Sequence, residues 1–386
     1  MSYDINIPPV LRIGAGSVKT LGDLVTSLGA SRPLVVTDPF LVSTGVAGRV
    51  ADLLNAAGAD AALYDGTIPD PTSDSLADGL AAATAHRADA LVAVGGGSPI
   101  DTAKALAVLA VRGGQMRELK APNRYDGEAL PVIAVPTTAG TGSEATMFTI
   151  ITDSQSQEKM LCAGRAYLPA AAIVDYELTV SMPPRLTADT GIDALTHAVE
   201  AYVSKKANPV SDAFALAAIS RIGRHLRPAY ANGASVIARD EMMTAATLAG
   251  IAFSNASVAL VHGMSRPLGA HFHVAHGMAN AMLFAEVTAF SVAAAEERYA
   301  TCARALGVAA AGDSAAVAAR ALVTELRQLA ADLAVPTPAS RGVDADQWEK
   351  LVPLMAEQAI ASGSPANNPR VPTAAQIEAL YRAIYA

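Results

Sequence analysis

The chain has 386 residues, of which 52% are hydrophobic and 17% charged, and its formal net charge is −8. This composition excludes a disordered chain, and the length favours two domains over a single core. The acidic balance, without any basic cluster, makes nucleic acid an unexpected partner. The chain contains only two cysteines, Cys162 and Cys302, so we expect no disulfide framework, which favours a reducing compartment.

The N-terminal stretch, MSYDINIPPVLRIG, lacks the basic start and apolar centre of a signal peptide. Charged residues, glycine or proline interrupt each long apolar run further along the chain. We therefore expect no membrane span and no membrane partner, and a cytoplasmic location.

In chain order, the first half alternates between short apolar runs and helical patterns. The apolar runs cover 33–37, 88–94 and 131–135, and the helical patterns between them include 46–58 and 73–86. Each apolar run ends in residues typical of turns. This alternation predicts βαβ units and a parallel sheet covered by helices on both faces.

From Pro184 onward the strand signal ends and helical spacing of apolar residues takes over. The predicted helical segments are 211–226, 239–253, 279–289, 314–333 and 373–385. The paired prolines Pro183 and Pro184 interrupt regular structure and mark the boundary. We therefore expect an α/β dinucleotide-binding domain over 1–183 and an all-helical domain over 184–386, with a cleft between them.

A glycine loop, Gly95-Gly96-Gly97-Ser98, follows the apolar run at 88–94 and precedes a predicted helix over 102–111. Glycines let backbone amides approach an anion, and the start of a helix adds partial positive charge, so this loop predicts a phosphate cradle. A tight turn without any ligand is the alternative. The segment PTTAGTGSE at 136–144 also follows an apolar run and brings hydroxyls to the same edge of the sheet, which favours the nucleotide interpretation.

Asp38 ends the first apolar run, in VVTDPF. A carboxylate there can accept a hydrogen bond from a ribose 2′-hydroxyl and repel a 2′-phosphate, which favours NAD over NADP. A turn-forming aspartate before Pro39 is an equally good interpretation.

Asp193 and His197 are four residues apart in TADTGIDALTHAVEAYVS, so on a helix they project from one face. His262 and His276 follow downstream as further imidazoles that could reach the same point. A carboxylate with imidazoles suits a borderline divalent cation such as Fe(II) or Zn(II). For His197 alone, a histidine satisfied in the core is the alternative, but its neighbour Asp193 and the two nucleotide loops favour a metal site.

Four ordered segments carry a resemblance to a known family: GGGSPIDTAKA at 95–105, PTTAGTGSE at 136–144, DTGIDALTHAVEAYVS at 189–204 and VHGMSRPLGAHFHVAHG at 261–277. Together they resemble the iron-containing (group III) alcohol dehydrogenases, in particular members of the lactaldehyde:propanediol oxidoreductase kind. The resemblance implies a dehydroquinate synthase-like architecture with a Rossmann-like α/β domain, an all-α metal-binding domain, and a homodimer or larger homo-oligomer.

By motif match, the resemblance places the metal ligands at Asp193, His197, His262 and His276, with Fe(II) as the first expectation and Zn(II) as the second. NAD is the implied cofactor. Its expected contacts are Asp38, Asp70, Gly95, Gly96, Gly97, Ser98, Asp101, Thr137, Thr138, Thr141 and Lys159. Asp70 stands where many members carry asparagine.

Two further residues are expected near the substrate. Phe253 would form an apolar wall, with a core aromatic as the alternative. Arg266 lies four residues after His262, where many members have histidine, and an arginine cannot act as a base at neutral pH. It could instead bind an anionic substrate group, or pair with an acid such as Glu200.

The implied activity is hydride transfer between NAD(H) and a small primary alcohol or aldehyde bound to the metal, with His276 at the reacting centre. The alternative within the superfamily is a reductase of a small anionic aldehyde or oxoacid, similar to maleylacetate reductase, that uses Arg266. A lyase of the dehydroquinate synthase type and a non-catalytic nucleotide- or metal-binding protein fit the motifs less well.

Overall fold

The protein is described here by a computed structural model covering residues 2–156 and 158–386. The chain divides into two compact units, one of Asn6–Ser181 and one of Met182–Ala386 together with the residues before Asn6. The division along the chain falls close to the predicted boundary after residue 183.

The first unit contains a six-stranded sheet in which all neighbouring strands are parallel, in the order β1-β8-β5-β4-β2-β3. Its strands are β1 (Val10–Ile13), β2 (Pro33–Val36), β3 (Ala62–Tyr64), β4 (Ala90–Gly95), β5 (Val132–Pro136) and β8 (Ala171–Val174). A separate antiparallel pair is formed by β6 (Phe148–Thr152) and β7 (Lys159–Ala163). The parallel sheet that the sequence predicted is confirmed.

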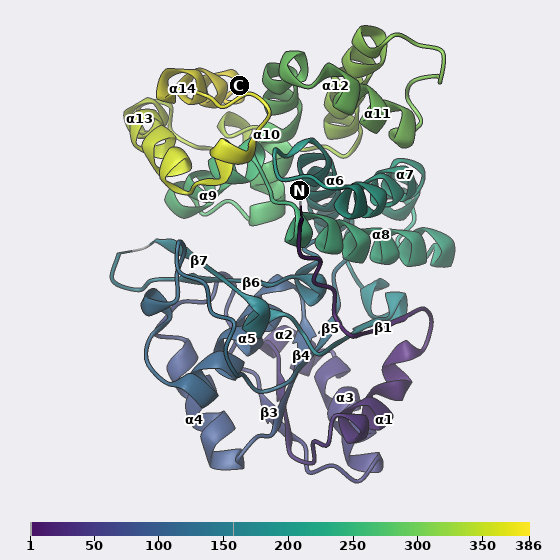
Figure 1. Ribbon diagram of the computed structural model, residues 1–386, viewed down its shortest axis with the longest axis vertical. Coiled ribbons are helices and arrows are strands. Elements are labelled where there is room, and N and C mark those ends of the chain that lie inside the picture. The colour runs from purple at the N-terminus through teal and green to yellow at the C-terminus, as the bar shows by residue number, and fades with distance from the viewer. Residues whose placement is uncertain (1, 157) are drawn as a thin grey trace. The chain divides into compact units, whose positions relative to one another are not determined.

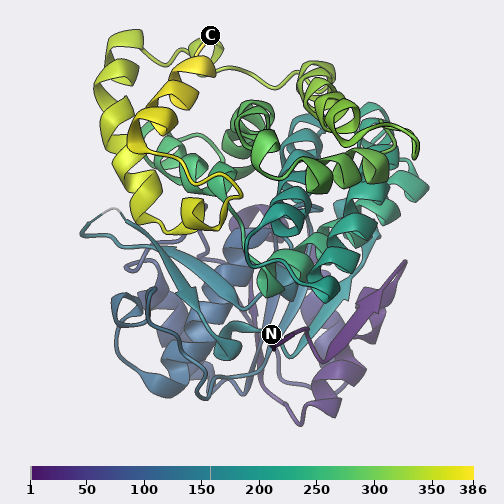
Figure 2. The ribbon, with the colours of Figure 1, turned by 45° about the horizontal axis from the view of Figure 1, so that its top comes forward.

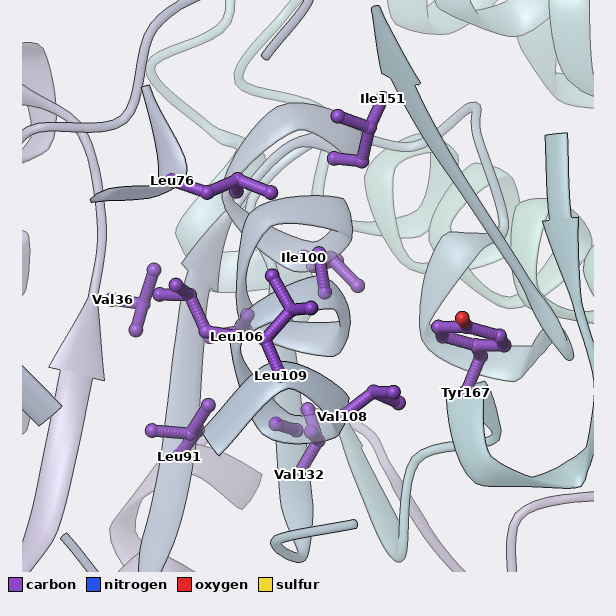
Figure 3. Packing of buried hydrophobic residues seen from close by; sticks show 14 of the residues in the cluster. Val36, Leu76, Leu91, Ile100, Leu106, Val108, Leu109, Val132, Ile151 and Tyr167 are labelled. Atoms are coloured by element: carbon purple, nitrogen blue, oxygen red, sulfur yellow. The ribbon is translucent and has the colours of Figure 1, made fainter. Parts of the chain in front are cut away.

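Helices cover both faces of this sheet because its strands are apolar on both sides. The helices are α1 (Leu21–Ser27), α2 (Pro39–Ser43), α3 (Val46–Ala56), α4 (Leu76–His86) and α5 (Gly97–Arg112). Val35 and Val92 pack in a cluster with α1 and α3, whereas Leu34 and Leu91 pack in a second cluster with α4 and α5. Figure 1 shows these two pairs of helices on opposite sides of the strands, and Figure 3 shows Leu91, Ile100 and Leu106 meeting in the second cluster.

The second unit is helical, and no strand follows Val174 in the part of the chain that is described. Its helices are α6 (Pro184–Val203), α7 (Pro209–Ala231), α8 (Val236–Asn255), α9 (Leu260–Phe272), α10 (His276–Ser291), α11 (Glu296–Leu306), α12 (Ala315–Asp332), α13 (Ala345–Ala361) and α14 (Ala374–Ala383). Figure 2 shows the last two, in yellow and yellow-green, packed side by side.

Helix α6 is the centre of this unit. Pro184 is its first residue and Pro183 its N-cap, so the paired prolines both end the preceding segment and begin the helix. All its residues from Thr187 to Val203 are buried, and α7, α8 and α10 pack around it. A polar side chain on α6 therefore points into protein and needs a partner there.

Among the described residues, one helical segment, His276–Ala294, is long and apolar enough to cross a membrane by length and composition, contrary to the prediction of no membrane span. In this window 61% of the residues are buried inside the fold. Because a central helix of a globular unit has the same properties, the segment is weak evidence for a membrane span.

Candidate metal centre and nucleotide site

Four side chains from three helices of the second unit converge on one point. Asp193 and His197 lie on α6, His262 lies in the first turn of α9, and His276 is the first residue of α10. Each offers one ligand atom, and these atoms all lie within 4.8 Å of one another. The structure thus brings together the four residues that the family motifs assigned to the metal.

The distances suit a single small cation. Asp193 Oδ1 lies 3.9 Å from His197 Nδ1 and 3.7 Å from the Nε2 atoms of His262 and His276. Ligands of a tetrahedral ion with bonds of about 2.1 Å would be about 3.4 Å apart. A modest contraction of the cluster therefore produces a coordination shell.

Asn280, one turn after His276 on α10, shows that the ligand atoms of Asp193, His262 and His276 face a common point. Its amide nitrogen lies 2.6 Å from Asp193 Oδ1, 3.1 Å from His262 Nε2 and 3.2 Å from His276 Nε2. The amide has two hydrogens for these three contacts, and its nitrogen lies close to all three atoms only because they face the same point, which is the arrangement that a cation needs. The residues present therefore fit a divalent metal.

Electrostatics keep the imidazole of His262 in the form that binds metal. Burial holds the pKa of His262 well below its usual value, and the neighbouring His197 and Arg266 lower it further. A neutral imidazole has a free lone pair for a metal. Burial also raises the pKa of Asp193, while His276 and Asn280 act in the opposite direction.

The cluster has one apolar wall and one more open side. The ring of Phe253, on α8, stacks on His197 with centroids 4.3 Å apart and an interplanar angle of 15°. The side chain of His276 is 38% exposed, whereas Asp193, His197 and His262 are each at most 5% exposed. A small molecule would therefore reach the cluster from the side of His276.

Arg266 lies one turn beyond His262 on α9, and its guanidinium donates a hydrogen bond to Ser364 Oγ at 3.1 Å. The pairing with Glu200 that the sequence left open is not found, because Glu200 binds the N-terminal end of α9 and His262 instead. Burial lowers the pKa of Arg266, and the more distant Glu200 raises it. Arg266 makes no ion pair with any of the described residues.

The predicted nucleotide residues all lie in the first unit, and most of them follow three neighbouring strands. Asp38 follows β2, the loop Gly95–Ser98 runs from the end of β4 into α5, and Thr137–Thr141 follows β5. The chain leaves β2 for β3 on one side and returns to β4 on the other. In open α/β sheets such a switch point, at the carboxyl ends of the strands, is where ligands bind.

The loop Gly95–Ser98 requires small residues where it meets the segment Thr137–Thr141. Gly95 has a φ of 152°, and a Cβ there would lie 2.4 Å from Pro99 Cγ. A Cβ on Gly96 would lie 3.3 Å from the side chain of Thr138, and one on Gly97 would lie 3.2 Å from that of Thr141. The glycines thus allow close packing of the loops and leave backbone amides at the start of α5 accessible to an anion.

Other predicted nucleotide residues have partners within the unit. Asp38 caps α2 by accepting the amide of Leu41 at 2.9 Å. Asp101 accepts Ser143 Oγ at 2.6 Å and the amide of Ile150 at 3.0 Å, so both its oxygens join α5 to the following segments. These contacts give Asp38 and Asp101 structural roles whether or not a nucleotide is bound.

Asp70 and Lys159 form an ion pair, with 2.9 Å between Oδ1 and Nζ. Asp70 has a φ of 50° in the segment after β3, and Lys159 is the first residue of β7. Both residues were predicted to contact the nucleotide, but their ion pair was not predicted, because they are 89 positions apart along the chain (159 − 70).

A glycine loop at the switch point of a parallel sheet, together with an Asp–His cluster on a helical unit, indicates a nicotinamide-dependent dehydrogenase that uses a metal. Comparison with known families agrees. The family described as iron-containing alcohol dehydrogenase matches residues 8–176, and the C-terminal part of the Fe-containing alcohol dehydrogenase family matches residues 187–385.

Individual relatives match over nearly the whole chain. It is 40% identical to the NAD-dependent methanol dehydrogenase of Bacillus methanolicus, over 96% of this chain and 97% of the relative. It is 37% identical to the lactaldehyde reductase of Escherichia coli K12, over 95% and 96%. A crystal structure of 1,3-propanediol oxidoreductase superposes with a TM-score of 0.96 at 36% identity and covers 100% of both chains.

The chain belongs to the iron-containing alcohol dehydrogenase family. It is an NAD-dependent alcohol dehydrogenase of the iron type, as the sequence motifs predicted.

Two residues at the metal cluster were missed by sequence reasoning. Glu200 was considered only as a partner of Arg266, and Asn280 was not considered at all. A signal was present for both: Glu200 is seven residues after Asp193, and Asn280 is four residues after His276, so each lies on the same helix face as a ligand.

Proposed function

We propose that the protein interconverts a small neutral primary alcohol and its aldehyde, using NAD(H) and a divalent metal held by Asp193, His197, His262 and His276. The observation that carries this proposal is the convergence of these four side chains within 4.8 Å in a chain of this family. When bound, the metal acts as a Lewis acid toward the substrate oxygen, and NAD exchanges the hydride.

The chain's own residues position the substrate and control its surroundings. Phe253, against His197, would place an apolar ring beside the substrate carbon and exclude water. The guanidinium of Arg266 stays protonated and cannot take up the alcohol proton, so we expect that proton to leave through water or a ribose hydroxyl. Backbone amides at the start of α5 would hold the cofactor's phosphates.

Several relatives favour neutral substrates. Their names refer to methanol, 1,3-propanediol and lactaldehyde, none of which is charged, whereas another relative at 37% identity is a choline dehydrogenase, named for a cationic alcohol. Two observations favour the alternative, an anionic aldehyde or oxoacid held by Arg266. Arg266 lacks an acidic partner among the described residues, and a sulfoacetaldehyde reductase, whose named substrate is anionic, is similar in structure at 27% identity. The relatives of higher sequence identity named above weigh against it. It is therefore kept as an outcome of the experiment and not as the proposal.

The test follows NADH at 340 nm with NAD and a series of short primary alcohols, before and after chelation and after addition of Fe(II) or Zn(II). We expect metal-dependent NADH formation and at least a hundredfold loss on chelation. Activity that survives complete removal of the metal would contradict the role of the cluster. So would failure of every alcohol and aldehyde with the metal-loaded enzyme.

The same assay decides on Arg266. Neutral aldehydes and their carboxylated or phosphonylated counterparts are compared in the wild type and in Arg266→His. The proposal expects neutral substrates to be preferred in both enzymes. A preference for the anionic substrates that disappears in Arg266→His would establish the alternative instead.

We further propose a homodimer or a larger homo-oligomer and a cytoplasmic location, and Fe(II) as the first candidate for the metal, with Zn(II) as the second. Light scattering of the purified protein and metal analysis after anaerobic purification test these expectations. The ligand set by itself accepts either ion.

A further inference from the structure

Glu200 is a buried carboxylate beside the metal cluster that is not one of its four ligands. It lies on α6 seven residues after Asp193 and three after His197, on the same face of the helix. Its side chain is only 4% exposed. Because burial of an ionised carboxylate is costly unless it is well hydrogen-bonded, the contacts of Glu200 indicate what it does.

One set of contacts is with the beginning of α9. Glu200 Oε2 accepts the amide of Ala259 at 2.8 Å, and Oε1 accepts the amide of Val261 at 2.6 Å. Ala259 is the N-cap of α9 and has no side chain able to cap it. Glu200 supplies the missing acceptor from another helix, with a negative charge at the positive end of the helix dipole.

The other contact is with the ring of a ligand. Glu200 Oε2 lies 2.7 Å from His262 Nδ1. Burial raises the pKa of Glu200 to about 7, and the amides of Ala259 and Val261 act in the opposite direction. Both oxygens already accept these backbone amides. With the carboxylate as the acceptor, the hydrogen of the neutral imidazole belongs on Nδ1. The Nε2 lone pair is then directed toward the amide of Asn280, at 3.1 Å, and into the group formed with the other three ligand atoms.

We propose that Glu200 is a positioning residue of the metal centre, fixing the backbone of His262 through the start of α9 and its ring through Nδ1, so that Nε2 is presented to the metal. The inference rests on the proposed metal function. Asp193 is held by Asn280 and His197 is stacked on Phe253, so each of these three ligands has its own support. Hydrogen-bonded partners of this kind orient the ligands of protein metal sites.

The test is the Glu200→Gln variant. Glutamine keeps the size of the side chain and one acceptor for α9, but its NH₂ group would face Nδ1 and favour the tautomer with hydrogen on Nε2. We expect Zn(II) affinity, measured by competition with a chromogenic chelator, to fall by about 10- to 100-fold. Glu286→Gln is the matched control, because Glu286 is a partly exposed carboxylate that pairs with Arg327, and it should retain wild-type affinity.

A second readout reports the tautomer directly. In protein with ¹⁵N-labelled histidine, the His262 ring should carry hydrogen on Nδ1 in the wild type, and this signature should be lost in Glu200→Gln. A merely structural role would lower stability without changing the tautomer. His262→Gln identifies the resonances, and binding of NAD to each variant checks that the other unit is folded.

The outcomes separate the two proposals. A wild-type protein that binds no metal at the cluster overturns the proposed function. Wild-type binding together with unchanged affinity in Glu200→Gln overturns the role of Glu200 alone. If the variant does not fold, the ¹⁵N spectrum of the wild type still tests the role of Glu200. Hydrogen on Nε2 of His262 in the wild type would contradict that role.

Discussion

The carboxylate of Asp38 has a structural contact and a proposed functional one. Oδ1 accepts the amide of Leu41 and caps α2, and the residue follows β2 at the switch point of the sheet. Capping uses one oxygen, so the second oxygen can meet a ribose hydroxyl. The negative charge would at the same time repel the 2′-phosphate of NADP.

Asp38→Ser separates these two roles, since serine also caps helices but carries no charge. We expect the ratio of kcat/KM with NAD to kcat/KM with NADP to fall at least tenfold, with little change in melting temperature. Asp52, an aspartate in the interior of α3, provides the control through Asp52→Ser. An unchanged cofactor ratio in Asp38→Ser would remove Asp38 from cofactor selection.

The sequence named the four proposed metal ligands but not the residues that hydrogen-bond to them. Asp193 and His197 are one helical turn apart and stand in a family motif, and the motifs around His262 and His276 are equally distinctive. The proposed role of Glu200 depends on its contact with His262, which is 62 residues away along the chain. The role of Asn280 depends in the same way on its hydrogen bond to Asp193. The spacing of residues along the sequence shows which face of a helix they share, but not which residues from other helices pack against that face.

Among helices and strands, length and burial account for part of what could be predicted. The run leading into β4 was recognised because both faces of that strand are buried and apolar. The three-residue strand β3 and the β6–β7 pair were not, since β3 is short and β6 and β7 are buried only at alternate residues. The four-residue strands β1 and β8 were not predicted either, although β8 is buried throughout. Helix α9 was missed as an element because Pro267 lies inside it.

Lys104 connects α5 with the segment after β5. Its ammonium is fully buried and donates to the carbonyl oxygens of Ser143, Thr146 and Phe148 at 2.6–2.9 Å. Burial lowers the pKa of Lys104 to about 8, although Asp101 and Glu144 act in the opposite direction. The pKa of an unfolded lysine is about 10.4.

This difference has a predictable sign. Between pH 8 and about 10.4 the unfolded chain holds the proton more tightly than the folded chain, so Lys104's contribution to the free energy of unfolding increases with pH. Below pH 8 its contribution is constant. From pH 7.5 to 9.5 the wild type should gain about 2 kcal/mol relative to Lys104→Met.

Urea unfolding of both proteins at the two pH values measures this gain, and the comparison cancels the other titrating groups. A difference between the two proteins that does not change with pH would mean that Lys104 remains an ammonium throughout. Its hydrogen bonds to the three carbonyls would then outweigh burial.

For the molecule as a whole, the two ligand sets belong to different units of the chain. Every proposed metal ligand lies within Met182–Ala386, and every proposed nucleotide contact lies within Asn6–Ser181. A ligand stabilises the folded state that binds it, by about 2.7 kcal/mol at a hundred times its dissociation constant. Each ligand should therefore protect its own unit when added alone.

Hydrogen exchange with Zn(II) alone and with NAD alone tests this expectation. Zn(II) should slow exchange in α6, α9 and α10, and NAD should slow it in the loops after β2, β4 and β5. Asp193→Asn should lose the protection by Zn(II) and keep that by NAD, because Asp193 lies within 3.9 Å of all three histidines and belongs to a different unit from the proposed nucleotide residues. If Zn(II) protected the variant as well as the wild type, the metal would be bound elsewhere, and the assignment of the Asp–His cluster would be wrong.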